Sequence, residues 1–259
     1  MTVAHPRATA VVLALTSVVG LAVFCWPLVA SVTPRGGGQS TPWLVLVLLP
    51  VLVLVVLLHL GQGGLDARTL AMLGVLSAVN AALRLVGAGV GGIELVFFLL
   101  VLAGYAFGPV FGFLLGAVSL FASALLTAGV GPWLPFQVLA CAWVGLGAGI
   151  LGHLLRGRVA PRGTIELAAL AAYAVLAAYA FGLLMNLWFW PFALGGDTAV
   201  SYVPGGTLGE NLRRFLLFTL TTSLAWDTVR AVTSVVAVVA LGRPVLGTFA
   251  RARRPASFG

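Results

Sequence analysis

Charged residues are scarce in this chain: Asp, Glu, Lys and Arg make up 8% of its 259 residues, against 61% hydrophobic residues. A soluble domain carries roughly 25% charged residues, so this composition excludes a soluble globular fold. Lysine is absent, and all 14 basic residues are arginines. The net charge of +8 does not indicate nucleic-acid binding, because the arginines lie at the ends of apolar segments, where they set topology. We predict an all-α integral membrane protein.

Cysteine is rare as well, and recognisable catalytic motifs are missing. Cys25 and Cys141 lie inside apolar runs without a CxxC pair, which excludes a disulfide framework. His5, His59 and His153 form no metal motif with Asp, Glu or Cys. No GxSxG, HExxH or Walker sequence is present. We therefore expect no metal site, no cofactor, no catalytic residues and no ATP hydrolysis by this chain.

Long apolar runs are abundant, and we predict eight membrane segments bounded by Gly, Pro or charge. The fourth, at about 15 residues, would rise only about 22 Å as a helix, less than the roughly 30 Å hydrocarbon core. It must therefore tilt, be covered by its neighbours or thin the bilayer. The predicted segments are about 8–32, 42–60, 68–88, 93–107, 110–129, 134–155, 166–190 and 212–241. They divide the chain into two N-terminal helices (1–66), a six-helix domain (67–242) and a basic cytoplasmic tail (243–259).

The arginines predict how these segments are oriented. Arginine clusters follow the sixth and eighth segments, and the positive-inside rule places both clusters in the cytoplasm. Counting back through eight crossings places the N-terminus there too, so both termini are predicted to be cytoplasmic. Nine of the 14 arginines then lie inside: Arg7, Arg68, Arg156, Arg158, Arg162, Arg243, Arg251, Arg253 and Arg254.

Polar and aromatic residues gather near the predicted outer face, in RLVGAGVGGIE (84–94), GVGPWLPFQ (129–137) and MNLWFWPF (185–192). This pattern is typical of a cavity that opens outward. Arg84 and Glu94 are each costly in a membrane, so we expect ligand contact or a salt bridge at the cavity mouth. The alternative is that Arg84 snorkels to the interface and Glu94 faces water.

The second and third stretches supply rings and primary amides. Aromatic belts are common at membrane interfaces, but rings from two separate turns also suit stacking on a flat ligand. Amides donate and accept hydrogen bonds, which suits a ligand rich in heteroatoms. We predict that the substrate-binding residues here are Trp133, Phe136, Gln137, Asn186 and Trp188.

Three further polar residues lie inside predicted helices. Asn80 precedes Arg84 by four residues, so the two share a helix face, and Asn80 either lines the cavity or bonds between helices. Asp227 and Arg230 are three residues apart, which allows an ion pair on one helix. A structural pair is the favoured interpretation, and a proton-coupled transport site is the alternative.

Small residues recur at three- and four-residue spacing along the third segment, which predicts a surface for close helix packing. Together with GYAFGPVFGFLLGAVSLFASAL (104–125) and GVGPWLPFQ, this stripe resembles the substrate-binding S components of energy-coupling factor (ECF) transporters. The resemblance covers about residues 67–242, and Ala67-x-x-x-Ala71 matches the AxxxA docking motif of the family. The stripe consists of Ala67, Ala71, Gly74, Ala78 and Ala82.

The resemblance implies a six-helix core that captures a vitamin or related micronutrient from outside and topples in the membrane to release it inside. It implies three partners, a transmembrane coupling subunit and two ATPase subunits, within the surrounding membrane lipids. Ala67 and Ala71 would dock against the coupling subunit. The GVGPWLPFQ turn would then form part of the wall or lid of the substrate site.

Substrate identity and two other functions stay open. The turn resembles the branch often assigned to cobalamin, while riboflavin, thiamine, biotin, queuosine-type precursors and other heterocycles are alternatives. The N-terminal histidine arrangement of the nickel and cobalt members is not reproduced in Met1–His5. An ion-coupled secondary carrier would use Asp227 or Glu94. A membrane enzyme acting on lipid would use Asp197 and Glu210 as acids.

Overall fold

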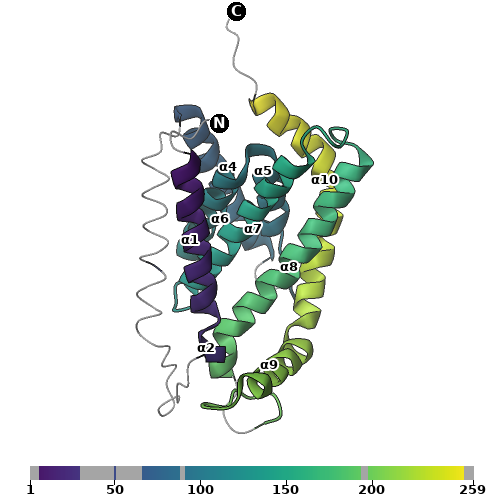
Figure 1. Ribbon diagram of the computed structural model, residues 1–259. Helices are drawn as coiled ribbons and strands as arrows, with labels where there is room; N and C mark the ends of the chain where they lie inside the picture. Colours follow the sequence, from purple (N-terminus) through teal and green to yellow (C-terminus); the bar gives the residue numbers. More distant parts are fainter. Residues whose placement is uncertain (1–5, 30–49, 51–65, 88–90, 194–197, 254–259) are drawn as a thin grey trace, which may run out of the picture.

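The computed structural model describes residues 6–29, 50, 66–87, 91–193 and 198–253. Over these residues the chain is helical and has no strand (Figure 1), which confirms the all-α prediction. The helices are α1 (Pro6–Phe24), α2 (Trp26–Val29), α4 (Ala67–Gly87), α5 (Val96–Phe107), α6 (Pro109–Leu126), α7 (Leu134–Leu155), α8 (Thr164–Ala193), α9 (Leu208–Thr222) and α10 (Leu224–Arg253).

Six of the described helices are long and apolar enough to cross a membrane, namely α1, α4, α6, α7, α8 and α10. The shorter α5 is also apolar. All of them except α1 fall in the predicted six-helix domain or continue from it, and α1 is the first of the two predicted extra N-terminal helices. Of the second extra segment, 42–60, only residue 50 is among the described residues.

Helix α5 is too short to span a bilayer, since 12 residues rise only about 18 Å. Eleven of its 12 residues are buried, and it packs against α4, α6, α7, α8 and α10. Its neighbours therefore cover it, which is one of the three arrangements that the sequence allows. At its end, Gly108 turns the chain with φ 102°, and Pro109 starts α6 directly.

The α6–α7 contact is the closest helix packing in the core. A Cβ added to Gly112 would overlap the backbone carbonyl of Gly145, and a Cβ on Gly145 would overlap that of Gly112. These two glycines let the helix backbones touch, which is the small-residue packing typical of membrane bundles. Around this seam, large apolar side chains such as Phe111, Leu115 and Leu139 are fully buried.

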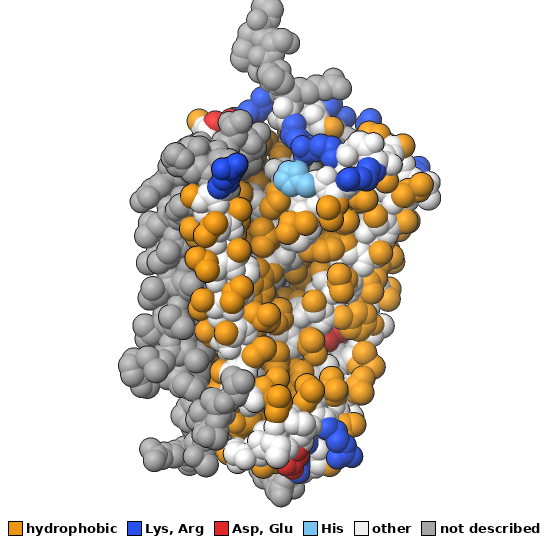
Figure 2. Space-filling view, viewed as in Figure 1, with side chains coloured by type: hydrophobic (Ala, Val, Ile, Leu, Met, Phe, Trp, Pro, Cys, Tyr) orange, Lys and Arg blue, Asp and Glu red, His pale blue; other side chains and the backbone are white. Residues whose placement is uncertain are grey.

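The two ends of the bundle differ in charge. The start of α1 and the end of α10 lie at one end, while α9 lies at the other (Figure 1). Basic side chains gather at the first end, and a band of hydrophobic side chains separates it from a smaller charged group near α9 (Figure 2). We call the first end the arginine-rich end, and it carries Arg156, Arg158, Arg162, Arg251 and Arg253.

The last predicted segment, 212–241, is wrong as a single helix. Ser223 separates α9 from α10, and α10 continues to Arg253, so the predicted boundary between 242 and 243 falls inside a helix. Helix α9 has one buried face and one charged, exposed face, so it lies at the end of the bundle instead of crossing it. At the break, the Ser223 side chain bonds to Asn186 on α8 and to Asp227 in the first turn of α10.

Candidate functional site

A polar ladder connects α4, α6 and α7 in the half of the bundle away from the arginine-rich end. Asn80 Nδ2 donates to Ser119 Oγ at 2.8 Å. One turn further along both helices, Arg84 Nη1 donates to Ser123 Oγ at 3.4 Å, and Arg84 Nη2 donates to Gln137 Oε1 at 3.3 Å. The i, i+4 spacing on α4 matches the same spacing on α6, so both pairs meet. Asn80 thus makes the interhelical bond that the sequence allows.

Some buried polar atoms beside this ladder have no hydrogen-bond partner among the described residues. They include Asn80 Oδ1, Ser77 Oγ on the preceding turn and Trp188 Nε1 on α8. Asn80, Ser77 and Trp188 are each at most 3% exposed. Unpaired polar atoms in a bundle interior are costly, and in a binding protein a ligand is one group that can satisfy them.

An aromatic cluster lies at the start of α7. Phe136 is fully buried, and its ring contacts Phe24 at 5.0 Å and Trp188 at 5.6 Å between ring centroids. Trp133 lies 6.4 Å from Trp188 in an edge-to-face arrangement, and Trp133 Nε1 donates to the Gly129 carbonyl at 3.3 Å. The two separate stretches 129–137 and 185–192 therefore do meet, with α1 contributing a ring.

This cluster gives the rings more partners than the sequence alone indicates. The Trp188 ring also stacks near Phe189 and Phe192, each with centroids 6.2 Å away. Gln137 is joined to Arg84 and not to the rings, and Asn186 bonds to Thr219 on α9 and to Ser223 between α9 and α10. Ring contacts thus cover Trp188, which is 3% exposed, so a ligand that stacks on Trp188 must displace another ring, while Trp133 is only partly buried.

A second network of charges joins α5, α8 and α10. Arg230 Nε donates to Glu94 Oε2 at 2.7 Å, and Arg230 Nη1 donates to Asp227 Oδ1. The guanidinium lies over the rings of Phe97 and Phe181, 5.6 and 5.1 Å from their centroids. The ion pair between Asp227 and Arg230 is confirmed. A salt bridge between Arg84 and Glu94 is not formed, because Glu94 pairs with Arg230.

Asn186 extends this network to the α9–α10 junction. Its Nδ2 donates to Ser223 Oγ at 2.6 Å and to Thr219 Oγ1 at 3.3 Å. Ser223 Oγ in turn donates to Asp227 Oδ2 at 3.1 Å. Helix α7 carries Gln137 of the polar ladder and packs against α5 and α8, which the charged network joins. The polar ladder and the charged network therefore border one interior region around α7.

Sequence reasoning missed several members of this region. Ser119 and Ser123 are hidden in an apolar run, although their spacing repeats that of Asn80 and Arg84. Phe24 belongs to α1, outside the predicted core, and no sequence signal connects it to Phe136. Of the acids considered for a lipid enzyme, Glu210 forms an exposed ion pair with Arg214 at 3.1 Å, while Asp197 lies outside the described residues.

No group of three His, Cys, Asp or Glu side chains within the described part of the chain could hold a metal ion. His153 lies at the arginine-rich end, and His5 and His59 lie outside the described residues. The six long apolar helices among the described residues define a multi-pass membrane protein. This class fits both the composition and the geometry.

Comparison with known families identifies the class more closely. A family model described as "ECF transporter, substrate-specific component" matches residues 68–242. The chain therefore belongs to the substrate-specific components of ECF transporters, which are membrane substrate-binding subunits. Comparison with curated proteins and with solved structures found no match.

Proposed function

We propose that this substrate-binding subunit captures an organic micronutrient in the interior region between the polar ladder and the charged network. The unpaired Asn80 Oδ1 and Trp188 Nε1 carry this proposal, since they offer one acceptor and one donor from two different helices. Arg84 adds a cation that bonds only to neutral side chains among the described residues. The region thus suits a flat heterocycle that carries amide, carboxylate or phosphate groups.

Cobalamin is the favoured ligand, because its corrin ring carries peripheral amides and a phosphodiester. A ligand of this size requires movement of the Trp133 turn, since Phe136 and Trp188 are buried by other rings. Smaller heterocycles such as riboflavin, thiamine or biotin would need less movement. Calorimetric titration of the purified chain with each compound decides between them.

The test of the site uses Trp133→Ala combined with Gln137→Ala. Loss of one ring contact is worth about 1 kcal/mol, so Trp133→Ala should weaken binding about fivefold and the double variant should weaken it further. Trp226→Ala is the control, because Trp226 is 52% exposed on α10. Unchanged affinity in a folded double variant would show that these residues form only an interfacial belt.

We propose that the protein assembles with a transmembrane coupling subunit and two ATPase subunits, and that the ATPase subunits hydrolyse the ATP. Helix α4 suits the contact with the coupling subunit because it is the least buried of the six candidate spans, with 28% of its window buried. All five small residues of its stripe are exposed among the described residues: Ala67, Ala71, Gly74, Ala78 and Ala82. The arginine-rich end would face the cytoplasm, following the positive-inside rule.

Ion-coupled secondary transport is the second candidate, and the Glu94–Arg230–Asp227 network is the observation that favours it. Two carboxylates share one guanidinium there, so one carboxylate could carry a proton. Uptake by the purified chain in ATP-free vesicles under an ion gradient would support this function. Uptake that requires the ATPase subunits would support the first.

A further inference from the structure

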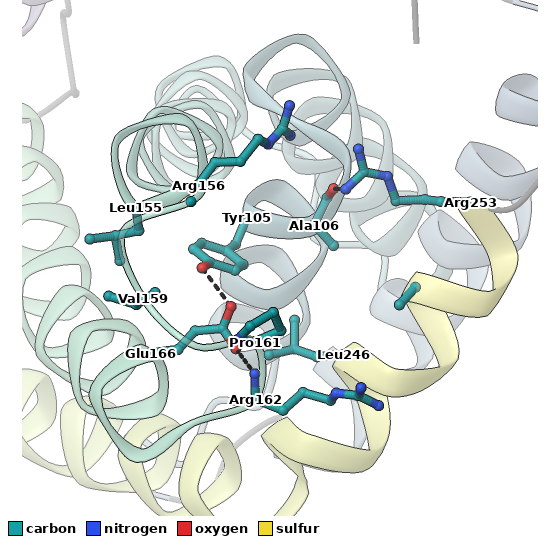
Figure 3. Close-up of a pocket in the computed structure, with 13 residues that line it drawn as sticks. Tyr105, Ala106, Leu155, Arg156, Val159, Pro161, Arg162, Glu166, Leu246 and Arg253 are labelled. Atoms are coloured by element: carbon teal, nitrogen blue, oxygen red, sulfur yellow. Dashed lines mark hydrogen bonds between the residues drawn. The ribbon is translucent and has the colours of Figure 1, made fainter.

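A cavity of about 260 Å³ opens at the arginine-rich end, between the α7–α8 turn and the last turns of α10 (Figure 3). Its walls combine apolar side chains, such as Leu155, Val159 and Leu246, with three arginines. The arginines are Arg156, Arg162 and Arg253, and all three are exposed. A head group at the membrane surface can therefore reach them without crossing the bundle.

The carboxylate in this cavity is already engaged. Glu166 is 7% exposed, and its Oε1 accepts a 2.7 Å hydrogen bond from the Tyr105 hydroxyl. Its Oε2 accepts a hydrogen bond from the backbone N–H of Arg162 (Figure 3). Glu166 thus ties the α7–α8 turn to α5, and it forms no ion pair with the three arginines.

Arg156 and Arg253 have the same charge and lie close together. Their guanidinium groups lie on the same side of the cavity (Figure 3), and the Arg156 charge acts on Arg253. Arg253 Nη1 donates to the Ala106 carbonyl at 2.7 Å, which fixes its position. The same two arginines line a neighbouring cavity of about 350 Å³. No carboxylate among the described residues forms an ion pair with either, so the pair is complementary to an anion.

We propose that this cavity binds the phosphate group of an anionic phospholipid from the adjacent leaflet. Basic pockets between helix ends bind such head groups, and a planar guanidinium matches a phosphate with two parallel hydrogen bonds. The volume suits a head group, while acyl chains would remain along the hydrophobic band of Figure 2. Free phosphate has the same chemistry, so the experiment must separate the two sources.

Native mass spectrometry of the detergent-purified chain with dioleoylphosphatidylglycerol tests the proposal. We expect Arg156→Gln combined with Arg253→Gln to weaken binding of one lipid about 10- to 30-fold, since each basic residue near an anionic head group contributes roughly a fivefold factor to binding. The matched control is Arg158→Gln combined with Arg251→Gln. Arg158 and Arg251 come from the same two segments, but they bond to Leu154 and Thr248 of their own helices and do not line the cavity.

Three further measurements complete the experiment. Arg156→Lys combined with Arg253→Lys keeps both charges but loses the planar guanidinium fork. It should bind lipid more weakly than the native chain and more tightly than the glutamine variant, which separates charge loss from misfolding. Inorganic phosphate at millimolar concentration should compete weakly, and competition equal to that of the lipid would assign the site to a free anion and overturn the lipid source. Phosphatidylcholine should bind more weakly than phosphatidylglycerol, because its net charge is zero.

Equal loss of lipid in the site variant and the matched control would overturn the proposal. Unchanged lipid binding together with lost binding of the coupling subunit would overturn it too, and would assign the arginines to a protein contact. None of these readouts uses a micronutrient, so the result is independent of the proposed transport function.

Discussion

At the scale of single residues, the Asp227 carboxylate occupies space that a glycine on α8 leaves open. A Cβ added to Gly182 would overlap both carboxylate oxygens. Asp227 bonds to Arg230 and Ser223 and is 3% exposed, so it cannot move without loss of those bonds. Alanine is the better helix former, and the charged network therefore accounts for glycine at this position.

Gly182→Ala should lower stability by about 1–3 kcal/mol, the range for overpacking a filled interior. Thermal unfolding in detergent, followed by circular dichroism, measures the effect. Gly209→Ala is the matched control, because a Cβ there would meet no atom within 4 Å, and it should be neutral or stabilise by up to about 1 kcal/mol. Equal midpoints for the two variants would show that Asp227 has room to move.

At the scale of elements, α4 presents different chemistry on its two sides. Asn80 and Arg84 bond to α6 and α7, while the exposed stripe around Ala71 and Gly74 has no side chain larger than a methyl group. A partner helix can approach such a stripe closely, which favours van der Waals packing in lipid. One helix thus joins the proposed substrate region to the proposed docking surface.

Ala71→Trp should reduce assembly with the coupling subunit at least tenfold and leave substrate affinity of the isolated chain unchanged, because the ring blocks close helix approach. Co-purification with the coupling subunit measures the first effect, and calorimetry measures the second. Val79→Trp serves as control, since Val79 is 44% exposed and lies about 100° around the helix from Ala78. Normal assembly of the Ala71 variant would show that the stripe does not dock against the coupling subunit.

The ends of helices can be predicted from the sequence where Gly, Pro or a charged residue interrupts an apolar run. The bounds 134–155 match α7, and the short fourth segment matches α5 within a few residues. The break at Ser223 has no such punctuation, and its cause is a side chain on α8, Asn186, more than 30 residues away. A tertiary contact of this kind cannot be read from a local pattern.

At the scale of the whole molecule, the charge difference between the two ends predicts how the bundle is oriented. Ala160 lies in the exposed turn at the arginine-rich end, and Ala199 is exposed near the opposite end. We expect Ala199→Cys to react with a membrane-impermeant maleimide on intact cells, and Ala160→Cys to react only after permeabilisation. Cys25 and Cys141 are replaced by serine and alanine for this experiment. The reverse labelling would place the proposed substrate region inside the cell.

The sequence predicted relations within single helices of the candidate region but not the contacts between helices. The i, i+4 and i, i+3 spacings predicted that Asn80 shares a face with Arg84, and that Asp227 pairs with Arg230. The partner of Glu94 was beyond prediction, because Arg230 lies 136 residues further along the chain and Arg84 is much nearer in sequence. Which of two cations meets a carboxylate depends on how all the helices pack.

Because 136 residues separate Glu94 from Arg230, the two residues are synthesised at different times. A ribosome adds about 5–20 residues per second, so Glu94 is made roughly 7–27 seconds before Arg230. During synthesis, the loop that carries Glu94 must wait at the membrane surface or in a partly hydrated state, because an unpaired carboxylate is costly in lipid. Helix α10 brings the counter-charge, so the ion pair between Glu94 and Arg230 forms only after α10 has been made.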